Sequence, residues 1–267
     1  MPDTQLEKLI TAVSNSPKYR HISPDLIRRI CERELVVRRS PKEAIKATKN
    51  KLHQIGGAYQ DSKIDYAKAI RRLEDAASSP DQLHATCRDL MRLHTSTRER
   101  LPIIDSFYQQ IFAELPPINS VLDIASGLNP LAIPWMPLAD NAVYYACDIY
   151  ADMMAFLHDA MSILGVGGRA EVRDVVGNPP TQPVDLALIL KTLPVLEMVD
   201  KTAVSRLLNT IQAKQLLITF PVRSLGGRSK GMIENYTTQF NTWATGRNWQ
   251  VQTFTFESEL AFLVSVN

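Results

Sequence analysis

The chain has 267 residues, of which 45% are hydrophobic and 22% charged, and its formal net charge at pH 7 is +2. This composition is ordinary for a globular protein, and no apolar run approaches the roughly 20 residues that span a bilayer. The first 16 residues lack the segments of a signal peptide, and the three scattered cysteines favour neither a disulfide framework nor a zinc site. We therefore expect a cytoplasmic protein without a metal site.

The charge is unevenly divided along the chain. Residues 1–100 hold 20 Lys and Arg against 13 Asp and Glu, a balance of +7, whereas residues 101–267 have a balance of −5. The stretch 18–51 alone holds 11 basic and 4 acidic residues. Such polarity indicates that the N-terminal part meets a polyanion, although charge alone is explained more simply by a solvated helical face.

Two serine–proline pairs mark helix starts in this basic part. Ser23 and Ser40 are placed as N-caps, Pro24 and Pro41 take the first helical positions, and Glu43 completes a capping box. Further helical patterns cover residues 66–77, 82–93 and 102–114. We expect residues 1–100 to form a basic helical domain.

From residue 119 onward, short apolar runs alternate with helical stretches. The predicted strands cover 121–124, 142–147, 170–173, 185–190, 215–220, 250–256 and 260–266, and the predicted helices cover 150–164, 193–211 and 231–245. Such alternation predicts a mainly parallel sheet with helices on both faces. The last two strands are separated by only three residues, so the final strand should be antiparallel. Residues 101–267 are thus predicted to form an α/β, Rossmann-like class I methyltransferase domain, with seven strands and an antiparallel C-terminal hairpin.

The segment after the first strand is the expected ligand site, because open α/β sheets bind ligands beyond the carboxyl ends of their strands. Residues 123–130 read DIASGLNP, so the backbone at Ala125 and Gly127 can approach a ligand closely. A single glycine is not the GxGxxG of dinucleotide enzymes, which disfavours a nicotinamide-dependent oxidoreductase. The tight turn fits a ligand without phosphate, such as S-adenosylmethionine.

Acidic residues end the next two strands. Asp148 lies about 20 residues beyond the turn, where a carboxylate can accept from both ribose hydroxyls. The alternative for Asp148 is a cap on the following helix. Asp174 follows the third strand, where it can accept from an adenine amino group while Val175 packs on the ring.

Three longer segments resemble the signatures of one enzyme family. Residues 94–101 read HTSTRERL, residues 123–132 read DIASGLNPLA and residues 220–232 read FPVRSLGGRSKGM. With shorter matches at 16–20, 52–59 and 190–197, they resemble the aminoglycoside-resistance 16S rRNA (guanine-N7) methyltransferases of the Arm/Rmt group. Two departures from the usual residues, Ser126 for Cys and Ser229 for Gly, remove no charged contact.

The resemblance implies methyl transfer from S-adenosylmethionine to N7 of guanine 1405, in the decoding site of the small ribosomal subunit, and hence aminoglycoside resistance. The broad basic N-terminal face favours the assembled 30S subunit over free RNA as the substrate. The resemblance also implies that Arg100 holds the methionine carboxylate, that His94, Thr95 and Ser96 lie against the same site, and that Tyr59 covers the cofactor. All the residues expected at the cofactor are Tyr59, His94, Thr95, Ser96, Arg100, Ala125, Gly127, Asp148, Ile149, Asp174, Val175 and Leu190.

The implied chemistry requires no general base, because guanine N7 carries a lone pair and no proton; no catalytic residue is therefore expected. The base is expected to be extruded into the pocket, with phosphate contacts offsetting the cost. The expected RNA contacts are Lys18, Arg20, Arg28, Arg29, Arg38, Arg39, Lys46, Lys51, Arg223, Arg228 and Lys230. The expected partner is 16S rRNA in the 30S subunit, bound by a monomer. Two alternatives remain open: methylation of another RNA target, and a non-catalytic RNA-binding protein on the same fold.

Overall fold

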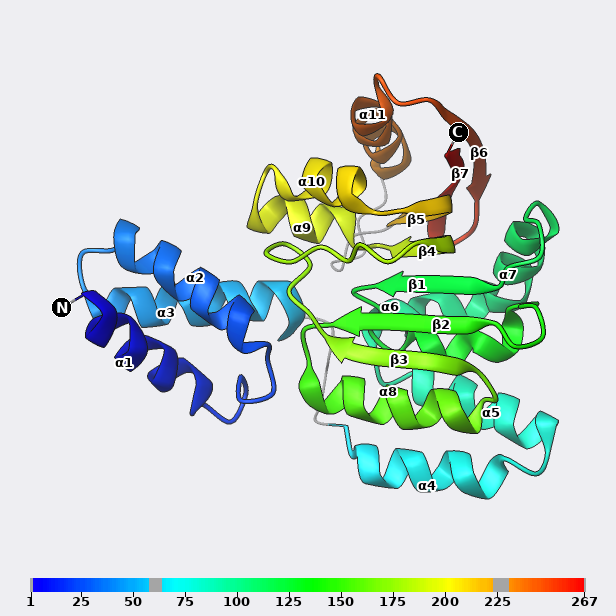
Figure 1. Cartoon of the computed structure of the whole chain (residues 1–267), viewed down its shortest axis with the longest axis horizontal. Coiled ribbons are helices and arrows are strands. Elements are labelled where there is room, and N and C mark those ends of the chain that lie inside the picture. The colour runs from blue at the N-terminus through cyan, green and yellow to red at the C-terminus, as the bar shows by residue number, and fades with distance from the viewer. Residues whose placement is uncertain (1, 58–63, 223–230, 267) are drawn as a thin grey trace.

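The first three helices form a group of their own at one end of the molecule (Figure 1). The computed structural model describes residues 2–57, 64–222 and 231–266. This group contains α1 (Pro2–Ser14), α2 (Pro24–Val37) and α3 (Pro41–Leu52), and the π-helix η1 (His53–Gly57) follows it. Both predicted caps are confirmed, since Ser23 Oγ accepts from the Leu26 amide at 3.4 Å and Ser40 Oγ from the Glu43 amide at 3.3 Å.

The rest of the chain is a helical lead followed by alternating strands and helices. Its helices are α4 (Tyr66–Ala76), α5 (Pro80–Met91), α6 (Thr95–Arg100), α7 (Ile104–Ala113), α8 (Ala151–Ile163), α9 (Leu193–Val199), α10 (Ala203–Thr210) and α11 (Met232–Ala244), with 3-10 turns η2 (Leu101–Ile103) and η3 (Asn129–Trp135). Its strands are β1 (Ser120–Ile124), β2 (Val143–Asp148), β3 (Gly167–Val172), β4 (Val184–Leu190), β5 (Ala213–Pro221), β6 (Trp249–Thr255) and β7 (Glu259–Val266).

The seven strands form one sheet in the order β3-β2-β1-β4-β5-β7-β6. The pairs from β3 to β5 are parallel, whereas β7 is antiparallel to both β5 and β6. The predicted fold class, with its antiparallel C-terminal hairpin, is confirmed. The predicted helix over 193–211 is instead two helices, because Asp200 accepts from the amide and hydroxyl of Thr202, both at 2.9 Å, and turns the chain between α9 and α10.

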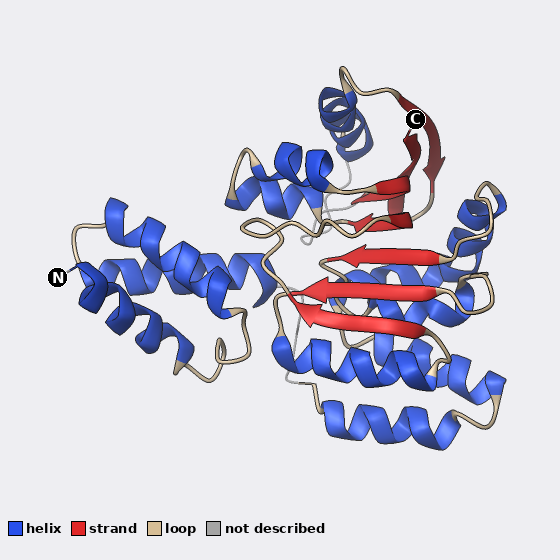
Figure 2. Cartoon of the chain, viewed as in Figure 1, coloured by secondary structure: helices blue, strands red, loops and turns tan. Residues whose placement is uncertain are grey.

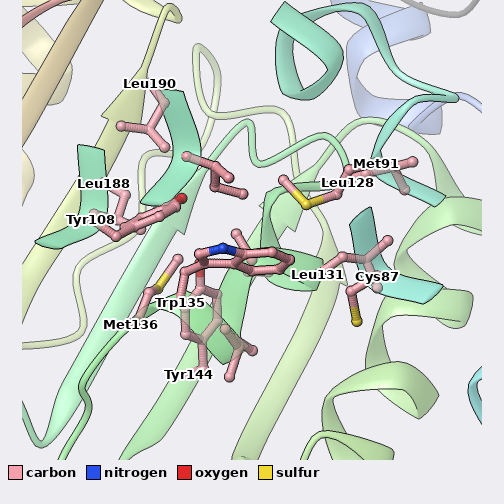
Figure 3. Close-up of a cluster of buried hydrophobic side chains, with 14 of the residues drawn as sticks. Cys87, Met91, Tyr108, Leu128, Leu131, Trp135, Met136, Tyr144, Leu188 and Leu190 are labelled. Carbon is pink, nitrogen blue, oxygen red and sulfur yellow. The ribbon is translucent and has the colours of Figure 1, made fainter. Parts of the chain in front are cut away.

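Each face of the sheet buries its own apolar cluster, and alternate residues of β4 supply them. Leu186, Leu188 and Leu190 belong to the cluster shared with α4, α5, α7 and α8, whereas Ala187 and Ile189 belong to the cluster under α9, α10 and α11. Helices therefore cover both faces (Figure 2). Figure 3 shows Leu188 and Leu190 in the first cluster, together with aromatic side chains from α7 and η3.

The helices of residues 2–100 are divided between two packing clusters. Buried side chains of α1, α2 and α3 pack together, whereas Leu73 of α4 and Met91 of α5 pack in the cluster of the sheet. The change of cluster falls between Leu52 and Ile64. The arrowheads of β1, β2 and β3 point toward the α1–α3 group (Figure 1), so this group lies at the carboxyl ends of the strands.

Candidate functional site

The turn after β1 has an unusual backbone. Ala125 and Gly127 both have positive φ values, 51° and 53°. The Gly127 amide donates to Asp148 Oδ2 at 3.0 Å. A Cβ at Gly127 would lie 2.6 Å from Cε1 of His94, so only glycine fits against that ring. The turn therefore brings the backbone close to His94, the residue that precedes α6.

Asp148 ends β2 with its carboxylate anchored by the backbone. Besides the bond from Gly127, its Oδ1 accepts from the Ile149 amide at 2.6 Å. Burial raises the pKa of Asp148 above its ordinary value, although these backbone bonds oppose the rise. The following helix α8 has Tyr150 as its N-cap residue and no side-chain capping bond. The alternative of a capping role for Asp148 therefore finds no support.

The carboxyl ends of β1, β2, β3 and β4 surround one pocket. Its empty volume is about 780 Å³, open solvent at the mouth included. Of the residues predicted at the cofactor, the pocket is lined by His94, Ser96, Ala125, Asp148, Ile149, Asp174, Val175 and Leu190. Tyr59 lies outside the described residues, as do Arg223, Arg228 and Lys230.

The α1–α3 group and the π-helix η1 that follows it close one side of this pocket. Leu26 and Arg29 of α2 and Ile55 and Gly56 of η1 contribute to the lining. A backbone hydrogen bond links the α1–α3 group to the sheet part of the chain, since the Ser23 amide donates to the Ile149 carbonyl at 2.7 Å. The pocket is therefore built by both parts of the chain.

Asp174, predicted to meet an adenine, already has a strong partner. Arg29 Nε donates to its Oδ2 at 2.6 Å and Arg29 Nη2 to its Oδ1 at 2.9 Å. Arg29 lines the pocket, and its predicted contact with RNA stays a prediction. Local sequence patterns cannot reveal this pair, because the two residues lie 145 positions apart.

Arg100 lies behind the pocket lining in a fully buried polar network. Its Nε lies 2.8 Å from Glu259 Oε1, its Nη2 donates to Glu259 Oε2 at 3.0 Å, and its Nη1 donates to Asn129 Oδ1 at 2.8 Å. Tyr108 donates to the same Asn129 oxygen at 2.7 Å. Burial opposes ionisation of Glu259, but the charges of Arg100 and then Lys191 hold its pKa below the ordinary value. The contact of Arg100 with a methionine carboxylate stays a prediction.

One lysine that lines the pocket was not among the cofactor residues expected from the sequence. Lys191 follows β4 with a positive φ of 59° and lines the pocket. Its Nζ donates to Glu99 at 2.8 Å and to the Ser96 carbonyl at 3.4 Å, and it lies 3.3 Å from Glu259. The signal was present in the sequence, since Lys191 belongs to the matched segment 190–197 directly after a strongly apolar run.

The two remaining predicted residues of α6 flank the pocket differently. Ser96 Oγ lies 3.2 Å from His94 Nδ1, at the pocket lining. Thr95 is buried, and its hydroxyl accepts from Arg98 at 3.4 Å. The structure therefore brings His94 and Ser96 to the pocket and leaves Thr95 beside it.

The predicted RNA contacts on the α1–α3 group differ in their surroundings. Arg28 pairs with Glu7 at 2.8 Å, whereas Arg38 and Lys51 share Glu34, at 2.8 Å and 2.5 Å. Lys18, Arg20, Arg28, Arg38, Arg39 and Lys46 are exposed, whereas Lys51 is partly buried. Among the described residues, no group of three His, Cys, Asp or Glu side chains could hold a metal ion. Within the same ranges, every helix is too short or too polar to cross a bilayer.

Comparison with known proteins points to one family. The family model described as "Ribosomal RNA methyltransferase (FmrO)" matches residues 15–263. A 16S rRNA (guanine(1405)-N(7))-methyltransferase of Micromonospora echinospora is 38% identical, over 98% of this chain and 97% of its own length. A protein of the same name from Serratia marcescens is 34% identical, over 97% of each chain. The crystal structure of the 16S rRNA methyltransferase RmtF in complex with S-adenosyl-L-homocysteine is similar, with 30% identity, 98% coverage of both chains and a TM-score of 0.84.

Proposed function

Because this chain belongs to the FmrO family of ribosomal RNA methyltransferases, we propose that it methylates N7 of guanine 1405 in 16S rRNA with S-adenosylmethionine as methyl donor. The observation that carries the proposal is the meeting of three separate segments in one pocket. His94 and Ser96 precede the sheet, Asp148 ends β2, and Lys191 follows β4, yet all four line the same space.

The pocket residues fit S-adenosylmethionine by their chemistry. The Asp148 carboxylate, fixed by two backbone bonds, would accept from the ribose hydroxyls. Val175 and Asp174 line the pocket, where they would offer an apolar surface to the adenine and an acceptor to its amino group. When bound, this cofactor supplies a methyl group already activated by a sulfonium.

The methionine carboxylate of that cofactor needs a cation. The resemblance assigns it to Arg100, whose guanidinium is held by Glu259 and Asn129. Lys191 already lines the pocket beside Ser96, so we propose that it shares this role. The two cations are linked through Glu259, which contacts both.

The protein's contribution to the chemical step is alignment. Guanine N7 attacks with its own lone pair, so no residue of this chain has to remove a proton. Well-oriented reactants can gain roughly 7–11 kcal/mol in favourable cases. A flipped guanine would enter between the two parts that build the pocket, at a cost of a few kcal/mol for unstacking.

We propose that the substrate is the assembled 30S subunit and that the protein binds it as a monomer in the cytoplasm. The modification should lower susceptibility to aminoglycosides that contact guanine 1405. The test is transfer of labelled methyl from S-adenosylmethionine to purified 30S subunits and, in parallel, to protein-free 16S rRNA. The proposal predicts label in the subunit and little in free RNA. Equal labelling of both would contradict the preference for the subunit, and no label in either would favour a non-catalytic RNA-binding protein.

A further inference from the structure

One face of α3 carries a shallow groove that shares no lining residue with the cofactor pocket. The groove is lined by Arg38, Glu43, Lys46, Ala47, Asn50, Lys51 and Gln54. Its empty volume is about 770 Å³, open solvent included. Three of these side chains are cationic, two are amides and one is acidic, so cations outnumber the carboxylate, and the cations and amides are donors that phosphate oxygens accept from. The groove therefore suits a polyanionic backbone.

A buried carboxylate holds two of the groove's cations. Glu34 of α2 is 0% exposed, although it belongs to a helix that faces solvent on its other side. Its Oε2 accepts from Arg38 Nε at 2.8 Å, and its Oε1 lies 2.5 Å from Lys51 Nζ. Burial opposes ionisation of this carboxyl, but hydrogen bonds from Lys51 and Arg38 keep its pKa below the ordinary value. The three side chains therefore form one ionic cluster across α2 and α3.

The cluster leaves its cations available to a ligand. The side chain of Arg38 is 45% exposed and that of Lys51 is 32% exposed. One carboxylate cannot neutralise two cations, so the cluster keeps a net positive charge. Long basic side chains ordinarily lose rotamer freedom when they bind a phosphate, and a cation that is already fixed avoids much of that loss.

We propose that Glu34 is a positioning residue for RNA binding: it holds Arg38 and Lys51 in the α3 groove, where they contact backbone phosphates of the ribosomal RNA. This inference rests on the proposed function for the identity of the RNA. It assigns to an acidic residue a favourable part in binding a polyanion, which is the opposite of what its charge alone would do.

A test can therefore separate the two effects, because they change the affinity for the 30S subunit in opposite directions. Glu34→Gln and Glu32→Gln each remove one negative charge from α2, but Glu32 is exposed. Simple electrostatics predicts that both variants bind the 30S subunit slightly more tightly. If Glu34 positions the two cations, Glu34→Gln should bind the 30S subunit about five- to tenfold more weakly than the wild type. Its log K should also depend less steeply on log salt concentration. Glu32→Gln should not bind the subunit more weakly than the wild type. Binding of purified 30S subunits is measured at several salt concentrations.

Thermal unfolding and the affinity for S-adenosylhomocysteine show whether Glu34→Gln is folded. If it folds poorly, two further variants keep the test decisive. Arg38→Gln and Lys51→Gln replace partly exposed side chains, and each should lose about one phosphate contact from the salt dependence. In the double variant lacking both cations, Glu34→Gln should have no additional effect on binding.

Equal subunit affinities of Glu34→Gln and Glu32→Gln would overturn the positioning role, and so would wild-type salt dependence in both cation variants. Either result would leave the methyltransferase proposal standing if the wild type still binds and labels the subunit. A wild type that binds no subunit would overturn both.

Discussion

Arg29 of α2 donates to both carboxylate oxygens of Asp174, at 2.6 and 2.9 Å, and so joins the basic helices to the wall of the cofactor pocket. The side chain of Asp174 is 4% exposed and that of Arg29 28%. A carboxylate this deeply buried depends on its partner for stability. The position of α2 and the shape of the pocket are therefore coupled through one ion pair.

Breaking that pair should affect stability and cofactor binding together. Arg29→Met leaves Asp174 without its charged donor, so we expect a loss of about 1.5–3 kcal/mol in the free energy of unfolding and weaker S-adenosylhomocysteine binding. In a double-mutant cycle, Asp174→Asn should remove most of the effect of Arg29→Met. Denaturant unfolding and calorimetry measure both quantities, and strictly additive single effects would show that the pair is not coupled.

The turn after β1 offers a test with a matched control. Gly127→Ala and Gly165→Ala both place a side chain at positive φ, 53° and 75°. Only the Cβ at Gly127 meets an obstacle, the His94 ring at 2.6 Å, whereas nothing lies within 4 Å at Gly165. Both variants should lose about 1 kcal/mol of stability from backbone strain. Gly127→Ala should also lose at least tenfold in affinity for S-adenosylhomocysteine, and equal affinities in the two variants would count against this turn as a ligand contact.

The role of Lys191 can be separated from general damage to the pocket by the choice of ligand. Lys191→Gln should weaken S-adenosylhomocysteine, which carries the amino-acid carboxylate, about tenfold. The same variant should bind 5′-methylthioadenosine, which lacks that carboxylate, as the wild type does. Calorimetric titration with both ligands decides the matter. Parallel losses would indicate that Lys191 shapes the pocket and does not contact the carboxylate.

Asp123 gives the protein a specific pH dependence. It is fully buried in β1, and burial raises its pKa to about 6 from 3.8. The folded state therefore favours the protonated carboxyl, and that stabilisation is present below pH 3.8 and lost as the pH rises through 6. Relative to Asp123→Asn, the wild type should lose up to about 3 kcal/mol of unfolding free energy between pH 4 and pH 7.

Urea unfolding of both proteins at several pH values within that window measures the difference. Asp140→Asn, which removes an exposed carboxyl, serves as the control. If the difference for Asp123→Asn were constant between pH 4 and pH 7, the buried carboxyl would not titrate there.

The sheet and the strand-end acid Asp148 follow from local patterns, because strand alternation and short connections constrain the topology. Pairs between distant segments cannot be predicted from local patterns. An example is Arg100 with Glu259, which lie 159 positions apart. Arg29 with Asp174, 145 positions apart, is a second example. Glu34 is an intermediate case: the buried residues of α2, namely Leu26, Ile27, Ile30, Cys31 and Glu34, follow a helical repeat. The repeat places Glu34 on the buried face of α2. Its partner Lys51 lies on α3, so this pair could be found only from the packing of the two helices.

Mapping the modified nucleotide is the sharpest test of the proposed site of methylation. 30S subunits are incubated with the protein and S-adenosylmethionine, the 16S rRNA is extracted, and N7-methylguanine is located by chemical strand cleavage and primer extension. We expect one new cleavage, at guanine 1405, that is absent when the cofactor is left out. A modification at any other nucleotide would contradict the proposed target.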